Sequence, residues 1–303
     1  MNLLWDSVRK CIDICEWFRD NEGLKGWRKS QSRKREIKSI FRVSSKVSSS
    51  GGKNKEARLA NTVNQYLDLC EKVELKVSFL LSQCIVFQKP ASFIKHLELQ
   101  YFYEMLVKHI DLVNRRIIEG EVIPSAEKLF SIFEPHVEWL TKGKKYKPVE
   151  IGHNVLIATD QFNFIVHHQV MENQMDVQIT KEVTTKLTDK FESILSLSFD
   201  KGFYSKENKE FVEKRIPKTI MPKKGKRNKI ETEQEHKAEF KKLRNAHSAV
   251  ESNINQLQHN GLGRCPDKGI KNFKRYTSLC ILAYNVHKLG EYISVGKDRK
   301  QAA

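Results

Sequence analysis

Two acidic residues, Asp200 and Glu251, stand in sequence contexts that could support metal chemistry. Asp200 ends the apolar run "ILSLSFD", and Lys201-Gly202 reverses the chain directly after it. In an open α/β sheet, ligands bind outside the carboxyl ends of the strands, so an acid at that point would face the natural site. A turn or helix-capping aspartate is the alternative, because Asp favours such positions.

Glu251 lies in "HSAVESNINQL", where apolar residues have helical spacing and His247 is one turn earlier on the same face. A solvated charge or a salt bridge is the usual role of such a glutamate. However, two carboxylates on separate elements can share a Mg²⁺ ion, which binds one or two carboxylates together with water and phosphate oxygens. Two such ions, about 3.5 to 4 Å apart, would hold the attacking and leaving oxygens of a phosphoryl transfer.

Other candidate ligands are weaker. Asp160 ends the run "GHNVLIATD" in the same way as Asp200, and a metal role competes there with a simple strand-end turn. The histidines have no ligand spacing with cysteine, and consecutive residues of a strand point to opposite faces. A zinc site is therefore not expected at the histidines concerned, His136, His153, His167 and His168.

Residues 1–125 have the apolar spacing of long helices. Apolar positions recur every three or four residues from Leu4 to Phe18, then from Leu59 to Cys84, and again from Leu97 to Ile117. Gly23 ends the first helix, Pro90 separates the other two, and residues 44–56, rich in Ser, Gly and Lys, are predicted to be a flexible loop. This region is therefore predicted to be an antiparallel helical bundle.

Residues 126–303 change to short strand-like runs alternating with helices, which indicates an α/β sheet flanked by helices. Helices are expected near residues 176–191 and 208–215, and residues 223–242 are expected to be a charged connection. Two further helices follow. Their apolar stripes, expected to pack on the sheet, are Ala249, Ile254 and Leu257 in one, and Tyr276, Leu279, Leu282, Val286 and Leu289 in the other.

The charge of the chain favours polyanionic partners. Its 303 residues carry a formal net charge of +17, which suits nucleic acid or anionic lipid surfaces. No stretch approaches the roughly 18 apolar residues of a membrane span. The six cysteines are scattered without a CxxC pair and are expected to be reduced, which indicates a cytoplasmic protein. Basic residues cluster at 27–42 and in "MPKKGKRNK", where solvated surface is the alternative to phosphate binding; the second run contains Lys223, Lys224, Lys226 and Arg227.

Several long motifs resemble those of the DDE transposases of bacterial insertion sequences, in a group outside the major families. They are "SIFEPHVEW", "GKKYKPVEIGHNVLIATD", "SLSFDKGFYSKENKE", "IMPKKGKRNKIE" and "HSAVESNINQLQHNGLGRCPDKGIKNFKRY". The resemblance implies an RNase H-like catalytic domain at 126–303 with a large helical insertion at 1–125. It also implies DNA strand cleavage and transfer with Mg²⁺ or Mn²⁺, in which Asp200 matches the second catalytic aspartate and Glu251 the final glutamate.

The resemblance further implies contacts to DNA and the absence of one catalytic strand. Lys201 and the basic run after the next strand would lie beside phosphates, and Arg244 and His247 stand where relatives carry a Tyr-Arg signature before the glutamate. In the family, the first catalytic aspartate lies on a strand just ahead of a segment like "NLLWDSVRKCI", which begins here at Asn2. That strand and its acid are therefore expected to be missing, which would leave unpaired strand edges.

Two functions follow as expectations. The first is a transposase that lacks its N-terminal part, with Asp200 and Glu251 as metal ligands and Asp160 as a weaker third acid. Because the first catalytic aspartate is missing, this chain is not expected to cut DNA by itself. The alternative is a catalytically dead DNA-binding remnant that associates with full-length transposase. Expected partners are DNA, at transposon ends and target, and a second copy or full-length transposase, but no membrane.

Overall fold

The computed structural model describes residues 1–83, 89–141 and 149–301, with side chains described as far as Ser294 in the last helix. The chain divides into two compact units, Met1–Pro135 and His136–Ala303. Cys84 lies outside the described residues. None of the helices in the described part is both long and apolar enough to cross a membrane.

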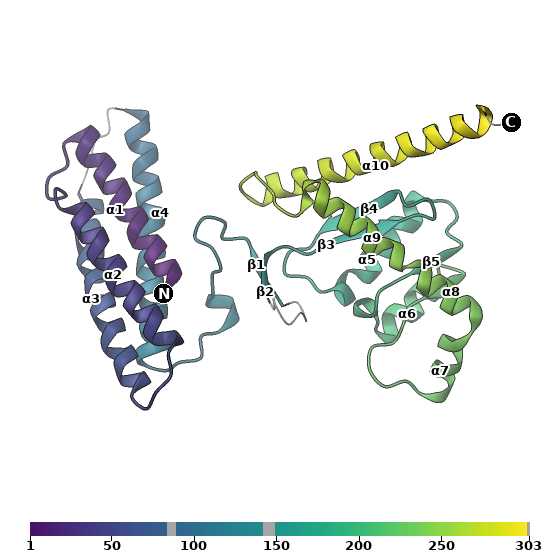
Figure 1. Ribbon diagram of the computed structural model, residues 1–303, viewed down its shortest axis with the longest axis horizontal. Coiled ribbons are helices and arrows are strands. Elements are labelled where there is room, and N and C mark those ends of the chain that lie inside the picture. The colour runs from purple at the N-terminus through teal and green to yellow at the C-terminus, as the bar shows by residue number, and fades with distance from the viewer. Residues whose placement is uncertain (84–88, 142–148, 302–303) are drawn as a thin grey trace. The chain divides into compact units, whose positions relative to one another are not determined.

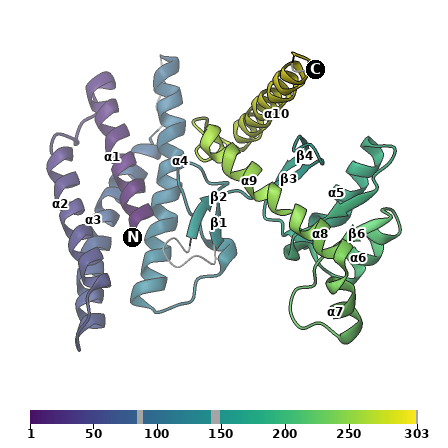
Figure 2. The ribbon, with the colours of Figure 1, turned by 45° about the vertical axis from the view of Figure 1, so that its right-hand side comes forward.

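Unit 1 is a bundle of long helices (Figures 1 and 2). These are α1 (Asn2–Glu22), α2 (Ser30–Ser49), α3 (Lys55–Leu81) and α4 (Pro90–Val113), the last extended by a π-helical turn at Asn114–Ile118. The apolar stripes of α1, α3 and α4, which the helical spacing predicted, meet in one core that Ile37 of α2 completes. Each fully buried aliphatic side chain contributes about 1.5–3 kcal/mol. The core includes Leu4, Val8, Ile12, Ile37, Tyr66, Val73, Leu99 and Leu106.

The sequence predicted the end of α1 correctly but not the end of α2. Helix α1 ends at Gly23, whose φ of 69° is left-handed, as expected of a glycine stop. Helix α2, in contrast, continues to Ser49, so the predicted loop at 44–56 was wrong for its first part. Ser44 is buried where α2 packs on α3, and its hydroxyl lies 3.1 Å from the Thr62 carbonyl of α3, so tertiary contacts hold this part of the chain as helix.

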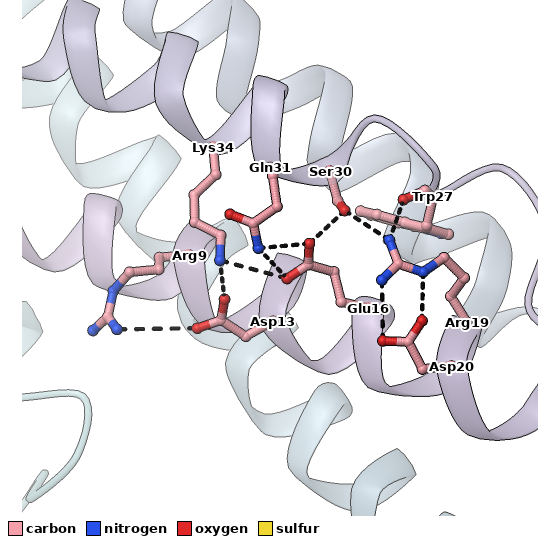
Figure 3. A network of polar contacts seen from close by, with 9 residues as sticks. All are labelled: Arg9, Asp13, Glu16, Arg19, Asp20, Trp27, Ser30, Gln31 and Lys34. Atoms are coloured by element: carbon pink, nitrogen blue, oxygen red, sulfur yellow. Dashed lines mark hydrogen bonds and ion pairs between the residues drawn. The ribbon is translucent and has the colours of Figure 1, made fainter.

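A polar network joins α1 to α2 along the basic stretch (Figure 3). Lys34 of α2 forms ion pairs with Asp13 and Glu16 of α1. Glu16 Oε1 also accepts a hydrogen bond from the hydroxyl of Ser30 at 2.5 Å. Lys34 of the basic run at 27–42 is therefore neutralised within the bundle.

Unit 1 extends beyond residue 125, where the sequence pattern changes. The hydroxyl of Tyr101 on α4 donates to the Ile132 carbonyl at 2.8 Å, and the Ile132 side chain is fully buried in the bundle core. The ring of Phe133 packs against Phe102 with centroids 6.0 Å apart. These contacts tie the segment before Pro135 to the helices.

Unit 2 is a mixed α/β structure, in agreement with the expected class. Strands β1 (Glu138–Thr141) and β2 (Val149–Gly152) pair antiparallel, as do β3 (Val155–Thr159) and β4 (Ile165–Val170), whereas β5 (Ser196–Ser198) and β6 (Lys218–Ile220) pair in parallel. Within the described residues each sheet has two strands, so every strand has a ladder partner on one side only. The sequence pattern led us to expect a single α/β sheet, whereas the described strands form three separate pairs.

Helix α5 (Asp176–Lys190) connects two of these sheets through its buried face. Ile179, Val183 and Leu187 pack in one cluster with Leu156 of β3 and Leu197 of β5. Helix α6 (Lys206–Glu213) packs in a neighbouring cluster, where Val212 is fully buried near Phe199 and Phe203. Apolar burial on α5 therefore fixes the position of the β5 end relative to the β3–β4 hairpin.

The C-terminal part corrects two expectations. The charged connection at 223–242 contains α7 (Lys229–His236) and α8 (Ala238–Ala246), and α7 begins with a capping box between Asn228 and Glu231. Helix α9 (Ser248–Leu257) follows and buries Leu257, but Ile254 of the predicted stripe is 38% exposed.

Helix α10 (Ile270–Gln301) packs with the face opposite to the one expected. The predicted contact residues Leu279, Leu282, Val286 and Leu289 are all exposed, whereas Thr277, Ile281 and Tyr284 are buried. The buried face was favoured because Tyr284 and its neighbour Asn285 hydrogen-bond the backbone of the β3–β4 hairpin at Asn163 and Ile165.

Candidate metal and nucleic-acid site

Asp200 lies where the sequence placed it, directly after β5. Phe199 is buried and its amide donates to the Ile220 carbonyl at 2.8 Å, so the pairing with β6 continues to the end of the strand. The Asp200 side chain is exposed, and its Oδ1 accepts a hydrogen bond from the Lys201 amide at 2.7 Å. Asp200 thus caps the short 3-10 turn Lys201–Phe203 while keeping its carboxylate at the solvent.

Asp176 is a second acid beside Asp200, and the sequence analysis missed it. It occupies the first turn of α5 and is half-buried. Burial raises its pKa, the negative charge of Asp200 raises it further, and the positive charge of Lys224 opposes the shift. The carboxylates of Asp176 and Asp200 therefore repel each other in the folded chain.

Gly202 lies against the side chain of Asp176. A Cβ built on Gly202 would overlap the Oδ2 atom of Asp176, and the Asp176 Cγ would lie 3.3 Å away. The sequence analysis explained this glycine by a sharp turn. The structure gives another reason, since the space beside its Cα is filled by the Asp176 carboxylate.

Glu251 lies on α9, as predicted, and its side chain is exposed. The opposite side of α9 packs on the body of unit 2, where Asn253 accepts a hydrogen bond from the Tyr284 hydroxyl at 2.8 Å. Residues two apart on a helix point about 200° apart, so Glu251 faces away from that contact.

Asp160 sits in the turn of the β3–β4 hairpin. Its Oδ1 accepts hydrogen bonds from the backbone amides of Phe162 and Phe164, both at 2.9 Å. These bonds stabilise the turn in which Asn163 adopts a positive φ of 66°. This geometry is that of the strand-end turn which the sequence left open as the alternative to a metal role.

The donor set at the β5 end suits a hard cation more than a soft one. Asp176 and Asp200 offer carboxylate oxygens, and Mg²⁺ is commonly held by one or two carboxylates together with phosphate oxygens. A cation would also relieve the repulsion that raises the Asp176 pKa. Across the described residues, no three His, Cys, Asp or Glu side chains come close enough together to hold a metal ion.

The basic residues predicted to bind phosphate fall into two groups. Lys223 pairs with Glu231 at 2.8 Å, and Arg227 pairs with the buried Glu235 at 2.9 Å, so α7 neutralises both. The second group consists of Lys201, Lys224, Lys226, Arg244 and His247. His247 is half-buried and the other four are exposed, and none of the five forms an ion pair in the described part of the chain.

Three of the four histidines make polar contacts, whereas the buried Nε2 of His167 has no hydrogen-bond partner among the described residues. His136 Nδ1 and His153 Nε2 lie 2.8 Å apart, and His153 Nδ1 lies 2.9 Å from Glu138 Oε1. Both ring nitrogens of His153 are therefore engaged. His168 Nε2 lies 3.0 Å from the hydroxyl of Ser278 on α10.

Comparison with known proteins gave no further identification: no protein-family model matches the chain, and neither a curated protein nor a solved structure matches it.

Proposed function

We propose that the chain is a DNA-binding protein of the DDE transposase type, acting in DNA strand cleavage and transfer with Asp200 and Glu251 as ligands of Mg²⁺ or Mn²⁺. The observation that supports it best is the end of β5. An exposed carboxylate there has a second acid beside it, with the exposed Lys224 from the loop after β6 close enough to act on Asp176 electrostatically. Metal-dependent DNA cleavage uses carboxylates that hold a metal ion, next to positively charged groups that neutralise phosphate.

The proposed arrangement assigns a separate task to each group. Lys201, Lys224 and Lys226 would neutralise DNA phosphates, and Asp200 would hold the cation that polarises the phosphoryl group. The order of unit 2, with an antiparallel hairpin, a helix and a parallel strand pair, supports an RNase H-like core. Binding of DNA and a cytoplasmic location are part of the same proposal.

A second candidate is a DNA-binding chain that does not cut. It is favoured by two observations. Asp160, the weaker third acid, has its Oδ1 engaged by two backbone amides, and the described residues contain no cluster of three potential metal ligands. In this case the exposed lysines would bind DNA, and association with an intact transposase would be the functional outcome.

A cleavage assay separates the two candidates. Supercoiled plasmid is incubated with the protein in Mg²⁺, in Mn²⁺ or in EDTA, beside the variants Asp200→Asn and Glu251→Gln. Metal-dependent nicking that both variants abolish would support cleavage. Binding of DNA in a gel-shift assay, without nicking in either metal, would support the second candidate. A chain that fails to bind DNA at low salt would contradict both.

A further inference from the structure

The exposed face of α10 carries a regular apolar seam. Its residues follow the three-four spacing of a heptad repeat and are about half exposed or more, with Leu282 at 59% and Val286 at 60%. The members of the seam are Leu279, Leu282, Val286, Leu289 and Ile293. At 1.5 Å per residue it runs about 21 Å along the helix.

The seam is separate from the face that α10 uses within its own unit. Ile281 and Tyr284 are 4% and 2% exposed, and they pack with Ile165 and Leu257 in a core cluster. Asn285 binds the backbone of Ile165 from the same face. One side of the helix therefore packs on its own unit, while a continuous row of large apolar side chains on the other side is exposed among the described residues of unit 2.

The residue types along the seam indicate what covers it. Taking Leu279 as position a of a heptad, the a positions continue with the β-branched Val286 and Ile293, and the d positions are Leu282 and Leu289. β-branched residues at a with leucine at d favour coiled coils of two strands over trimers and tetramers.

The flanking positions are compatible with a copy of the same helix. Positions e and g, which flank the seam, are uncharged. The e positions are Ala283 and Gly290. The g positions are Ser278, Asn285 and Tyr292, each of which also hydrogen-bonds the β3–β4 hairpin. Two copies of a chain with a net charge of +17 would repel at a charged interface. Neutral flanks remove that repulsion where the helices touch, and the small Ala283 and Gly290 leave room for close approach.

We propose that α10 pairs with the α10 of a second copy of this chain through this seam, as a two-stranded coiled coil. Such pairing buries the five seam residues of each copy, which a monomer leaves as an unusually regular exposed apolar row. The inference goes beyond the proposed function and does not depend on it, since dimerisation requires neither DNA nor metal.

Sedimentation equilibrium of the full chain, without DNA, tests the proposal. We expect a concentration-dependent monomer–dimer equilibrium. The double variant Leu282→Ala/Leu289→Ala removes four seam side chains from each dimer, so we expect the dimer Kd to rise about a hundredfold or more. The matched control is Leu75→Ala/Phe79→Ala, which truncates two side chains on α3 that are 66% and 68% exposed; it should leave Kd unchanged.

Three results would overturn the proposal. The wild-type chain could stay monomeric at all concentrations, or the dimer could persist unchanged in the seam variant. Alternatively, the seam variant could lose far-UV circular dichroism while the control keeps it. That loss would show that the seam is covered within the chain itself.

Discussion

The carboxylate of Asp176 lies in an environment that favours its protonated form. Its pKa is raised first by burial and then by Asp200. An acid with a raised pKa in the folded state costs stability once it ionises, so this cost is absent below the unfolded pKa near 3.9 and complete above the folded pKa. We therefore expect Asp176→Asn to raise the melting temperature at pH 7, with a difference that shrinks toward pH 4.

Thermal unfolding at the two pH values measures this effect. Asp68→Asn, at an exposed position of α3, provides the control, because it removes one acid from a solvent-exposed site. Mg²⁺ should stabilise the wild type more than the Asp176→Asn variant if the cation sits between the carboxylates. A lower melting temperature for Asp176→Asn at pH 7 would contradict the repulsion.

Gly202 offers a second test at the residue scale. Its substitution by alanine would place a methyl group onto the Asp176 carboxylate, which must then move. We expect Gly202→Ala to destabilise the fold by about 1–3 kcal/mol, the usual range for forcing extra atoms into a packed site. Urea unfolding measures the change, and Gly51→Ala is the control because nothing lies within 4 Å of its added Cβ. Equal stability of both variants would show that Asp176 moves freely.

At the scale of elements, a side chain of α10 forms hydrogen bonds with the backbone of β4. The Asn285 amide accepts from the Ile165 amide and donates to the Ile165 carbonyl, both at 2.9 Å. Ile165 is only 4% exposed, so water cannot easily replace these bonds. This one side chain makes the hydrogen bonds that a neighbouring strand would otherwise make at Ile165.

Replacing Asn285 should therefore cost more than one hydrogen bond. Asn285→Leu would leave a buried donor and a buried acceptor unsatisfied, and we expect a loss of about 2 kcal/mol or more. Chemical denaturation measures the loss. The control is Asn255→Leu, at an exposed position of α9. A loss no greater than that of the control would mean that the β4 edge is satisfied in another way.

Periodicity predicted some helices well and others poorly, for identifiable reasons. Helices α1, α3, α4 and α5 have dense apolar stripes. Helix α2 was missed as a helix because Ile37 is its only fully buried apolar residue among many charges. For α10 the more apolar stripe was chosen, but the buried face is defined by Tyr284 and Asn285, whose polar atoms satisfy the hairpin. Hydrophobicity alone cannot reveal that choice.

The candidate site shows the same limit. The position of Asp200 at a strand end followed from local sequence, and the structure places it there. Asp176 could not be found in this way, because its closeness to Asp200 depends on how α5 packs over both β3 and β5. The assignment of Lys223 and Arg227 to DNA also overlooked α7, whose Glu231 and Glu235 pair with them.

At the scale of the whole molecule, only part of the positive charge is available to bind a partner. Ion pairs within the fold take up Lys34, Lys223 and Arg227, among others. Lys224 and Lys226 lie in the same loop and are exposed, and the described residues include no ion-pair partner for either. DNA binding should therefore depend on these two lysines more than on their ion-paired neighbours.

We expect DNA affinity to fall steeply with salt, because each phosphate contact releases condensed counterions. The logarithm of the binding constant should fall by about 0.9 per contact for each tenfold rise in salt. Lys224→Gln/Lys226→Gln should flatten that slope by roughly 1 for each lysine that touches a phosphate. Fluorescence anisotropy with a DNA duplex at several salt concentrations measures it. The variant Lys46→Gln/Lys53→Gln in unit 1 has the same net charge and exposed positions. If both variants flatten the slope equally, binding follows total charge and the loop after β6 has no special role.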